Sequence, residues 1–182
     1  MNKSNIVLMG FMGCGKSTIG KLISQKIQSE FVDTDFLIEK KIGISISSFF
    51  EKYGENSFRQ IEEEIISEIA QGKNQVIATG GGIIKNFNNI SNLRANGIIV
   101  YLNASPSHIF QNLKGDTTRP LLNTKDKLET INALLNERKP LYERYADIIV
   151  NVNHQLIQDI VTTILRHIGE DKYEKNSCDS WT

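Results

Sequence analysis

The sequence predicts an α/β protein in which helices cover both faces of a parallel sheet. Short apolar runs alternate with helical patterns along the chain, as in repeated strand–helix units. Most of these runs are continuously apolar, which is typical of strands that are buried on both faces. A glycine-rich turn joins the first apolar run to the first helical pattern, where sheets of this class hold phosphate groups.

Five short apolar runs are the expected strands: Asn5–Met9, Glu30–Val32, Gln75–Thr79, Gly97–Leu102 and Asp147–Asn151. The expected helices are Lys16–Gln28, Ser47–Lys52, Ser57–Gln71, Pro106–Lys114, Lys125–Tyr145 and Gln155–Ile168. The last helix is the clearest, because its apolar residues recur at helical spacing along one face. For a chain of 182 residues we expect one domain over residues 1–168, followed by a polar, disordered tail at residues 169–182.

The glycine-rich turn at residues 10–17 (GFMGCGKS) fits the phosphate-binding pattern GxxxxGK[ST] at every required position. Its glycines let backbone N–H groups turn around phosphate oxygens, and the helix N-terminus that follows favours an anion. Lys16 supplies a positive charge for the β- and γ-phosphates, and the Ser17 hydroxyl is a ligand for Mg²⁺. A chance glycine turn is the alternative interpretation. We expect the nucleotide to contact Gly13, Cys14, Gly15, Lys16, Ser17 and Thr18.

Composition and charge narrow the class of protein further. The chain has 21 basic and 21 acidic residues, so we expect no nucleic-acid partner and no membrane contact. No apolar stretch approaches the ~20 residues that span a bilayer. Cys14 and Cys178 make no disulfide framework, and the N-terminus has no signal peptide, so we expect the reducing cytoplasm. A monomer is a separate expectation. Cys14 is most simply a small residue in a tight loop, and a redox role is the alternative.

Two carboxylates follow the second expected strand, at the edge where open α/β sheets bind ligands. Asp33 and Asp35 lie two residues apart, and beside a triphosphate they are suited to two tasks. One carboxylate would organise Mg²⁺ and its waters, and the other would orient an acceptor hydroxyl. An acidic turn that caps the following helix is the alternative interpretation.

Arg59 belongs to a capping-box pattern, Ser57-Phe-Arg-Gln60, which places this arginine in the first turn of a helix. A cation there opposes the helix macrodipole, and Glu62 is close enough along the helix to offset that effect. Arg59 is therefore either part of a solvated, salt-bridged face or an anion-binding arginine held by Glu62.

Arg138 lies on the apolar stripe of its expected helix, at helical spacing from Ile131 and Leu135. A buried charge needs a partner, unless the long side chain extends to the surface. The planar guanidinium is suited to a carboxylate or a phosphate. Arg59 and Arg138 are therefore candidates to converge on one carboxylate, which indicates an anionic acceptor.

Two further segments are candidate parts of the functional site. Gly80, Gly81 and Gly82 follow the third expected strand and would place bare N–H groups at the sheet edge, although a plain turn is the alternative. Residues 114–122 are polar with a single arginine, Arg119, and are expected to form either a lid over the phosphates or an ordinary surface loop.

Together these residues resemble the shikimate kinase family. The elements of that family occur here in its order and approximate spacing: the phosphate loop at residues 10–17, Asp33-Thr-Asp35, Phe58-Arg59 followed by Glu62, Gly80-Gly81-Gly82, Arg119-Pro-Leu-Leu122 and Arg138-Lys-Pro-Leu-Tyr142. The resemblance covers about residues 5–168. The loop alone indicates only nucleotide binding, whereas the combination is far more specific.

The resemblance implies ATP-dependent phosphorylation of the 3-hydroxyl of shikimate with Mg²⁺, in the aromatic amino-acid (chorismate) pathway. It also implies a three-layer α/β/α fold of the P-loop NTPase type, with a five-stranded parallel sheet in the order 2-3-1-4-5. A substrate-binding segment is expected at about residues 33–62 and a lid at about residues 112–124.

The same resemblance assigns roles to individual residues. The implied catalytic residues are Lys16, Asp35 and Arg119. The implied contacts to shikimate are Asp35, Arg59, Gly81 and Arg138, and the implied metal ligands are Ser17 and, through water, Asp33. Arg119 and Gln155 would border the nucleotide. Some members also place an arginine against adenine ahead of the lid, where this chain reads Gln111-Asn112-Leu113-Lys114.

Other functions share parts of this pattern. A gluconate kinase also has a carboxylate substrate, and a nucleoside-monophosphate kinase also has the phosphate loop, but the GGG and RPLL elements argue against both. A nucleotide-gated switch would carry DxxG and NKxD elements. This chain has no DxxG, and Asn123-Thr-Lys-Asp126 places its lysine one position late.

Overall fold

The structure, a computed structural model, describes residues 3–115, 124 and 126–177. Its centre is a five-stranded sheet with parallel neighbours throughout, in the order β2-β3-β1-β4-β5. The strands are β1 (Asn5–Met9), β2 (Glu30–Asp33), β3 (Gln75–Ala78), β4 (Gly97–Asn103) and β5 (Ile148–Asn151). The three central strands are almost completely buried, which explains their continuous apolar runs. The predicted fold class and strand order are confirmed.

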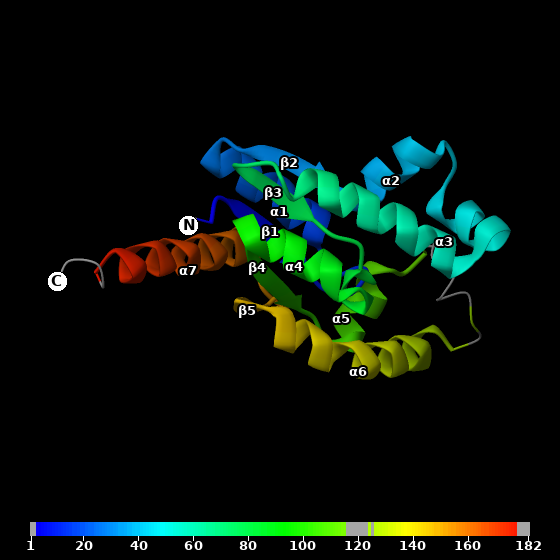
Figure 1. The fold of residues 1–182 in the computed structure, drawn as a ribbon. Helices are drawn as coiled ribbons and strands as arrows, with labels where there is room; N and C mark the ends of the chain where they lie inside the picture. The colour runs from blue at the N-terminus through cyan, green and yellow to red at the C-terminus, as the bar shows by residue number, and fades with distance from the viewer. Residues whose placement is uncertain (1–2, 116–123, 125, 178–182) are drawn as a thin grey trace.

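Helices lie on both faces of the sheet and give three layers (Figure 1). They are α1 (Lys16–Ile27), α2 (Thr34–Ile42), α3 (Ile46–Ile69), α4 (Phe87–Asn96), α5 (Pro106–Asn112), α6 (Lys127–Tyr145) and α7 (Ile157–Ser177), with a 3-10 turn η1 (Ile83–Lys85). Helix α1 packs with α7 on one face, and α3 packs with α4 on the other.

Two helices, α2 and α4, were not among those predicted, and a third, α7, extends further than predicted. Helix α2 begins inside the segment interpreted as an acidic turn, and α4 is rich in asparagine, which has a low helix propensity. Helix α7 continues to Ser177, so residues 169–177, which were expected to belong to a disordered tail, are helical. None of the described helices has the length and apolar content to cross a membrane.

A break at Gly54 divides α3 and corrects the predicted position of Arg59. Gly54 has φ 77° and ψ 175°, a conformation that glycine adopts without a steric penalty. The helix resumes after this residue, ahead of the expected capping box, so Arg59 lies beyond the first turn. The two helices expected in this region are therefore the two halves of α3, but the expected helix start at Ser57 is wrong.

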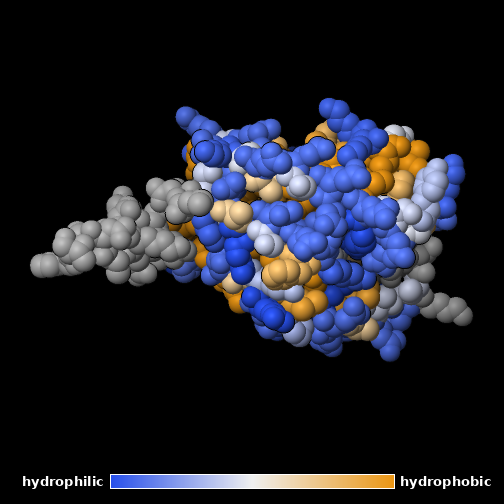
Figure 2. Space-filling view, in the orientation of Figure 1, coloured by the Kyte–Doolittle hydropathy of each residue, from blue (hydrophilic) through white to orange (hydrophobic). Residues whose placement is uncertain are grey.

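The segment formed by α2 and α3 has a small core of its own. Its buried cluster consists of Ile38, Phe49, Phe58 and Ile65, separate from the larger cluster around the sheet. Figure 1 shows α2 and the start of α3 at the opposite end of the molecule from the C-terminal end of α7. Figure 2 shows hydrophobic surface at the same end, where Phe36 and Ile44 are exposed.

Candidate active site

One cleft of about 610 Å³ contains every predicted site residue that the structure describes. These residues are Gly13, Cys14, Gly15, Lys16, Ser17, Thr18, Asp33, Asp35, Arg59, Gly81, Arg138 and Gln155. They come from the phosphate loop and the start of α1, the end of β2, α2, α3, the glycine segment at residues 80–82, α6 and the residues after β5. The remaining predicted residue, Arg119, lies outside the described residues, as does most of the expected lid.

The phosphate loop adopts the conformation that its glycines permit. Gly13 and Gly15 have φ of 77° and 96°, which side chains other than glycine rarely adopt. Gly15 directly precedes α1, so the backbone N–H groups at this helix start face the cleft. The Lys16 ammonium donates hydrogen bonds to the carbonyls of Gly10 and Phe11, both at 2.9 Å, which hold it against the loop.

Cys14 is buried within the loop. Its Sγ lies 3.8 Å from Lys16 Nζ, and a Cβ placed on Gly10 would approach this sulfur to 2.8 Å. This crowding favours the interpretation of Cys14 as a small residue in a tight loop, because a larger side chain would have no room.

Asp33 caps α2, as the alternative interpretation of its sequence expected, and also contacts Ser17. Its Oδ1 accepts hydrogen bonds from the backbone N–H groups of Asp35 and Phe36, at 3.1 and 3.3 Å, and so caps α2. Its Oδ2 accepts the hydroxyl of Ser17 at 2.6 Å. The cap fixes the start of α2, and Asp35 in the first turn of that helix lines the cleft.

The glycine segment after β3 is packed too closely for side chains. A Cβ on Gly80 would lie 2.8 Å from Asp35 Oδ1 and 3.3 Å from Glu62 Oε1. A Cβ on Gly81 would lie 3.2 Å from the backbone nitrogen of Met12 in the phosphate loop. The segment therefore lies between the phosphate loop and the acidic side chains, which a plain turn would not require.

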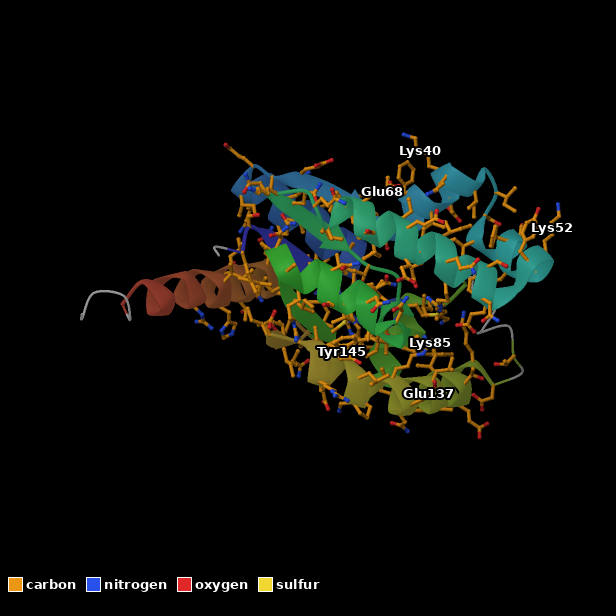
Figure 3. All side chains as sticks on the ribbon, viewed as in Figure 1. Lys40, Lys52, Glu68, Lys85, Glu137 and Tyr145 are labelled. Carbon is orange, nitrogen blue, oxygen red and sulfur yellow. The ribbon has the colours of Figure 1, made fainter. Side chains whose placement is uncertain are left out.

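Arg59 is held by two carboxylates on its own helix. Its guanidinium contacts Glu62 Oε2 at 2.7 Å and Glu55 Oε1 at 3.0 Å, and Lys85 contacts the same Glu55 oxygen at 2.9 Å (Figure 3 labels Lys85). Glu62 is only 1% exposed. Burial raises the pKa of the Glu62 carboxyl, against the opposing effect of Arg59. This network orients Arg59 toward the cleft and favours the anion-binding interpretation.

Arg138 does not extend to the surface, because it is only 3% exposed. Within the described part of the chain, its buried Nε has no hydrogen-bond partner, and no carboxylate forms an ion pair with the guanidinium. Its guanidinium carbon lies 5.7 Å from the centre of the Phe11 ring. A buried arginine at the wall of a cleft with an unused donor is suited to bind an anion.

Several cleft residues were not predicted from the sequence. Phe50 and Phe58 of α3 form an apolar wall beside Arg59, and no local pattern distinguishes them from the other apolar residues of this helix. Asn112, at the start of the expected lid, donates from Nδ2 to the carbonyl of Gly13 at 2.9 Å. This side chain therefore helps to hold the phosphate loop in place. Gln155, by contrast, was expected from the sequence to border the nucleotide, and it donates from Nε2 to the carbonyl of Asn151 at 2.9 Å.

The chain is similar to known proteins over most of its length. The family model described as shikimate kinase matches residues 12–169. The chain is 43% identical over 162 residues to the shikimate kinase of Caldanaerobacter subterraneus subsp. tengcongensis, covering 89% of this chain and 94% of that protein. It is 45% identical over 162 residues to the shikimate kinase of Thermodesulfovibrio yellowstonii, covering 89% and 93%.

A solved structure shows the same fold. The structure of the shikimate kinase from Acinetobacter baumannii in complex with shikimate superposes with a TM-score of 0.89 at 37% sequence identity. The match covers 93% of this chain and 94% of that one. The chain therefore belongs to the shikimate kinase family.

Proposed function

We propose that this protein transfers the γ-phosphoryl group of ATP to the 3-hydroxyl of shikimate, giving shikimate 3-phosphate and ADP. The observation that carries the proposal is a buried arginine with an unused donor, Arg138, in the same cleft as a phosphate loop. The loop accounts for the triphosphate, and the arginine accounts for a carboxylate on the acceptor.

The phosphate loop and α1 hold ATP in this proposal. Backbone N–H groups from Gly13 to Thr18 surround the phosphates, and Lys16 neutralises charge on the β- and γ-phosphates. For this purpose its ammonium moves from the carbonyls of Gly10 and Phe11 onto the phosphates. Gln155, at the wall of the cleft, borders the nucleotide.

Ser17 and Asp33 fit a Mg²⁺ ion. Their side-chain oxygens are 2.6 Å apart at the cleft, and Mg²⁺ prefers hard oxygen ligands. The described residues contain no group of three or more metal-binding side chains. Mg²⁺ is commonly held by one or two protein groups together with phosphates and water. When bound, the ion would supply positive charge for the β- and γ-phosphates.

Shikimate occupies the part of the cleft between α2, α3, α6 and the glycine segment. Arg138 and Arg59 bind its carboxylate, and the backbone of Gly81 contacts the acceptor. Asp35 hydrogen-bonds to the 3-hydroxyl and accepts its proton as the oxygen attacks. Because phosphoryl transfer depends chiefly on positioning and charge, these contacts direct the hydroxyl in line with the bond between the γ-phosphorus and the leaving oxygen of ADP.

Arg119 is proposed from the sequence alone as the lid arginine that stabilises the transferring phosphoryl group. The single kinase domain at residues 1–168, with its substrate segment at about 33–62 and its lid at about 112–124, likewise stays a prediction. A monomeric state and a cytoplasmic location stay predictions as well.

An ADP-release assay with ATP, Mg²⁺ and a panel of acceptors tests the proposal. We expect ADP release with shikimate, and no release above background with gluconate, with nucleoside monophosphates or without an acceptor. Turnover of gluconate or a nucleoside monophosphate instead of shikimate would assign another acceptor. ADP release that is independent of any acceptor would favour a nucleotide-gated switch.

A further inference from the structure

Tyr142 is a completely buried residue that joins two walls of the cleft without lining it. It lies on α6, one turn after Arg138, and its hydroxyl donates to the carbonyl of Gly81 at 2.5 Å. Arg138 and Gly81 are two of the proposed contacts to shikimate. A single hydroxyl therefore connects the helix that carries one contact to the segment that carries the other.

The ring of Tyr142 is held in place independently of its hydroxyl. It stacks on Tyr101 of β4, with ring centres 5.0 Å apart and an angle of 16° between the planes. Tyr101 is also completely buried, and its own hydroxyl is directed to Asn103 at 3.3 Å. The phenol of Tyr142 is thus fixed against the centre of the sheet, and its oxygen is a rigid anchor for Gly81.

Gly81 needs such an anchor because glycine restricts its backbone dihedral angles less than any other residue, and here three glycines follow one another. On either side, Gly80 donates its N–H to Thr34 Oγ1 at 3.0 Å, and the carbonyl of Gly82 accepts a hydrogen bond from the backbone N–H of Lys85 at 3.1 Å. For Gly81 itself, the hydrogen bond formed within the described residues is the one that its carbonyl accepts from the Tyr142 hydroxyl. Burial raises the pKa of the Tyr142 hydroxyl, although Arg138 opposes this, so the hydroxyl stays protonated and able to donate.

We propose that Tyr142 is a positioning residue for the acceptor, which fixes the spacing between Arg138 and the Gly81 backbone through its hydrogen bond to the Gly81 carbonyl. The inference rests on the proposed function. It distinguishes the two substrates, because the Tyr142 hydroxyl bonds to Gly81, a proposed contact to the acceptor, rather than to the phosphate loop.

The test compares Tyr142→Phe with Tyr101→Phe in steady-state kinetics. Both variants remove one buried hydroxyl from the same stacked pair, and only the first removes the bond to Gly81. A net hydrogen bond of about 0.5–1.5 kcal/mol corresponds to roughly a 2- to 10-fold change, so we expect KM for shikimate to rise by that factor in Y142F. We expect KM for ATP and kcat to stay within about 2-fold in Y142F, and every parameter to do so in Y101F.

Equal changes in Y142F and Y101F, or equal rises in the two KM values of Y142F, would show a general packing role and overturn the proposal. If Y142F is too unstable for assay at 25 °C, calorimetric titration of shikimate and of an ATP analogue at 10 °C gives the same comparison as dissociation constants. Failure of the unaltered protein to turn over shikimate would overturn the proposed function itself, whereas a normal unaltered protein with an unaffected Y142F would overturn only this inference.

Discussion

Replacing Arg138 with lysine separates charge from geometry at the proposed carboxylate site. The side chain is only 3% exposed, and its buried Nε has no hydrogen-bond partner among the described residues, so the guanidinium is shielded from bulk water. Lysine keeps the positive charge but has no planar fork, and its ammonium cannot form two parallel bonds to one carboxylate. The substitution therefore removes one charge-assisted hydrogen bond in the complex with shikimate.

The size of the effect follows from that lost bond. A hydrogen bond to a charged group contributes about 1.5–3 kcal/mol, and a loss of about 2 kcal/mol is roughly a 30-fold change in binding. We expect KM for shikimate to rise about 30-fold in R138K, while KM for ATP stays within about 2-fold, because Lys16 and the phosphate loop are unchanged.

Steady-state kinetics with each substrate varied at a saturating level of the other measures the effect. Arg144→Lys is the matched control, since Arg144 lies on the same helix, is exposed, and packs over the Tyr145 ring. The reasoning is refuted if shikimate kinetics are unchanged in R138K, if the two KM values rise together, or if R144K behaves like R138K.

Three other substitutions test the site and its core. Gly80→Ala would place a Cβ 2.8 Å from Asp35 Oδ1, so we expect kcat to fall about 10-fold or more by displacement of the acceptor-directing carboxylate, as measured at saturating substrates. Asp33→Asn keeps an oxygen to cap α2 but loses a carboxylate, so an assay over a range of Mg²⁺ concentrations should need more Mg²⁺ for half-maximal rate. Burial raises the pKa of Tyr101 and Tyr142, so their contribution to stability is complete below about pH 10, where unfolded tyrosine begins to ionise, and is lost as the pH rises further. Urea unfolding measures the free energy of unfolding between pH 9 and pH 11. This free energy should fall less steeply with pH in Tyr101→Phe than in the unaltered chain, and the two slopes should differ by at most about 1.4 kcal/mol per pH unit.

Each of these three substitutions is compared with a second variant or with the unaltered chain. Gly43→Ala adds a Cβ with nothing within 4 Å, at a positive φ of 73°, so it should lower thermal stability without lowering kcat. An equal fall in kcat in both glycine variants would contradict the role given to Gly80. Asp33→Ala also removes the helix cap and should lower thermal stability by about 1 kcal/mol more than Asp33→Asn. Parallel pH profiles for Tyr101→Phe and the unaltered chain would contradict the tyrosine assignment.

The sheet, the phosphate loop and the place of Arg138 could be predicted because each is encoded locally. Continuous apolar runs mark buried parallel strands, and the loop pattern fixes a strand before it and a helix after it. Arg138 could be singled out because it is a charged residue in an apolar stripe, and the structure confirms that its side chain is buried.

Other features depend on competing effects or on distant contacts. The capping box at Ser57 was misleading because Gly54 breaks α3 ahead of it. Helix α4 forms from an asparagine-rich segment because tertiary packing on α3 overrides its low propensity. The bond from Tyr142 to Gly81 joins residues 61 positions apart, and no local pattern predicts such a contact.

The measurement that tests the central claim most directly is phosphorus NMR of the product formed from ATP and shikimate. The account predicts one new phosphate-monoester signal, coupled to the hydrogen on carbon 3 of shikimate, that grows in step with ADP. A phosphate on another oxygen would contradict the proposed placement of the acceptor against Asp35. Inorganic phosphate as the only new product would contradict phosphoryl transfer to shikimate altogether.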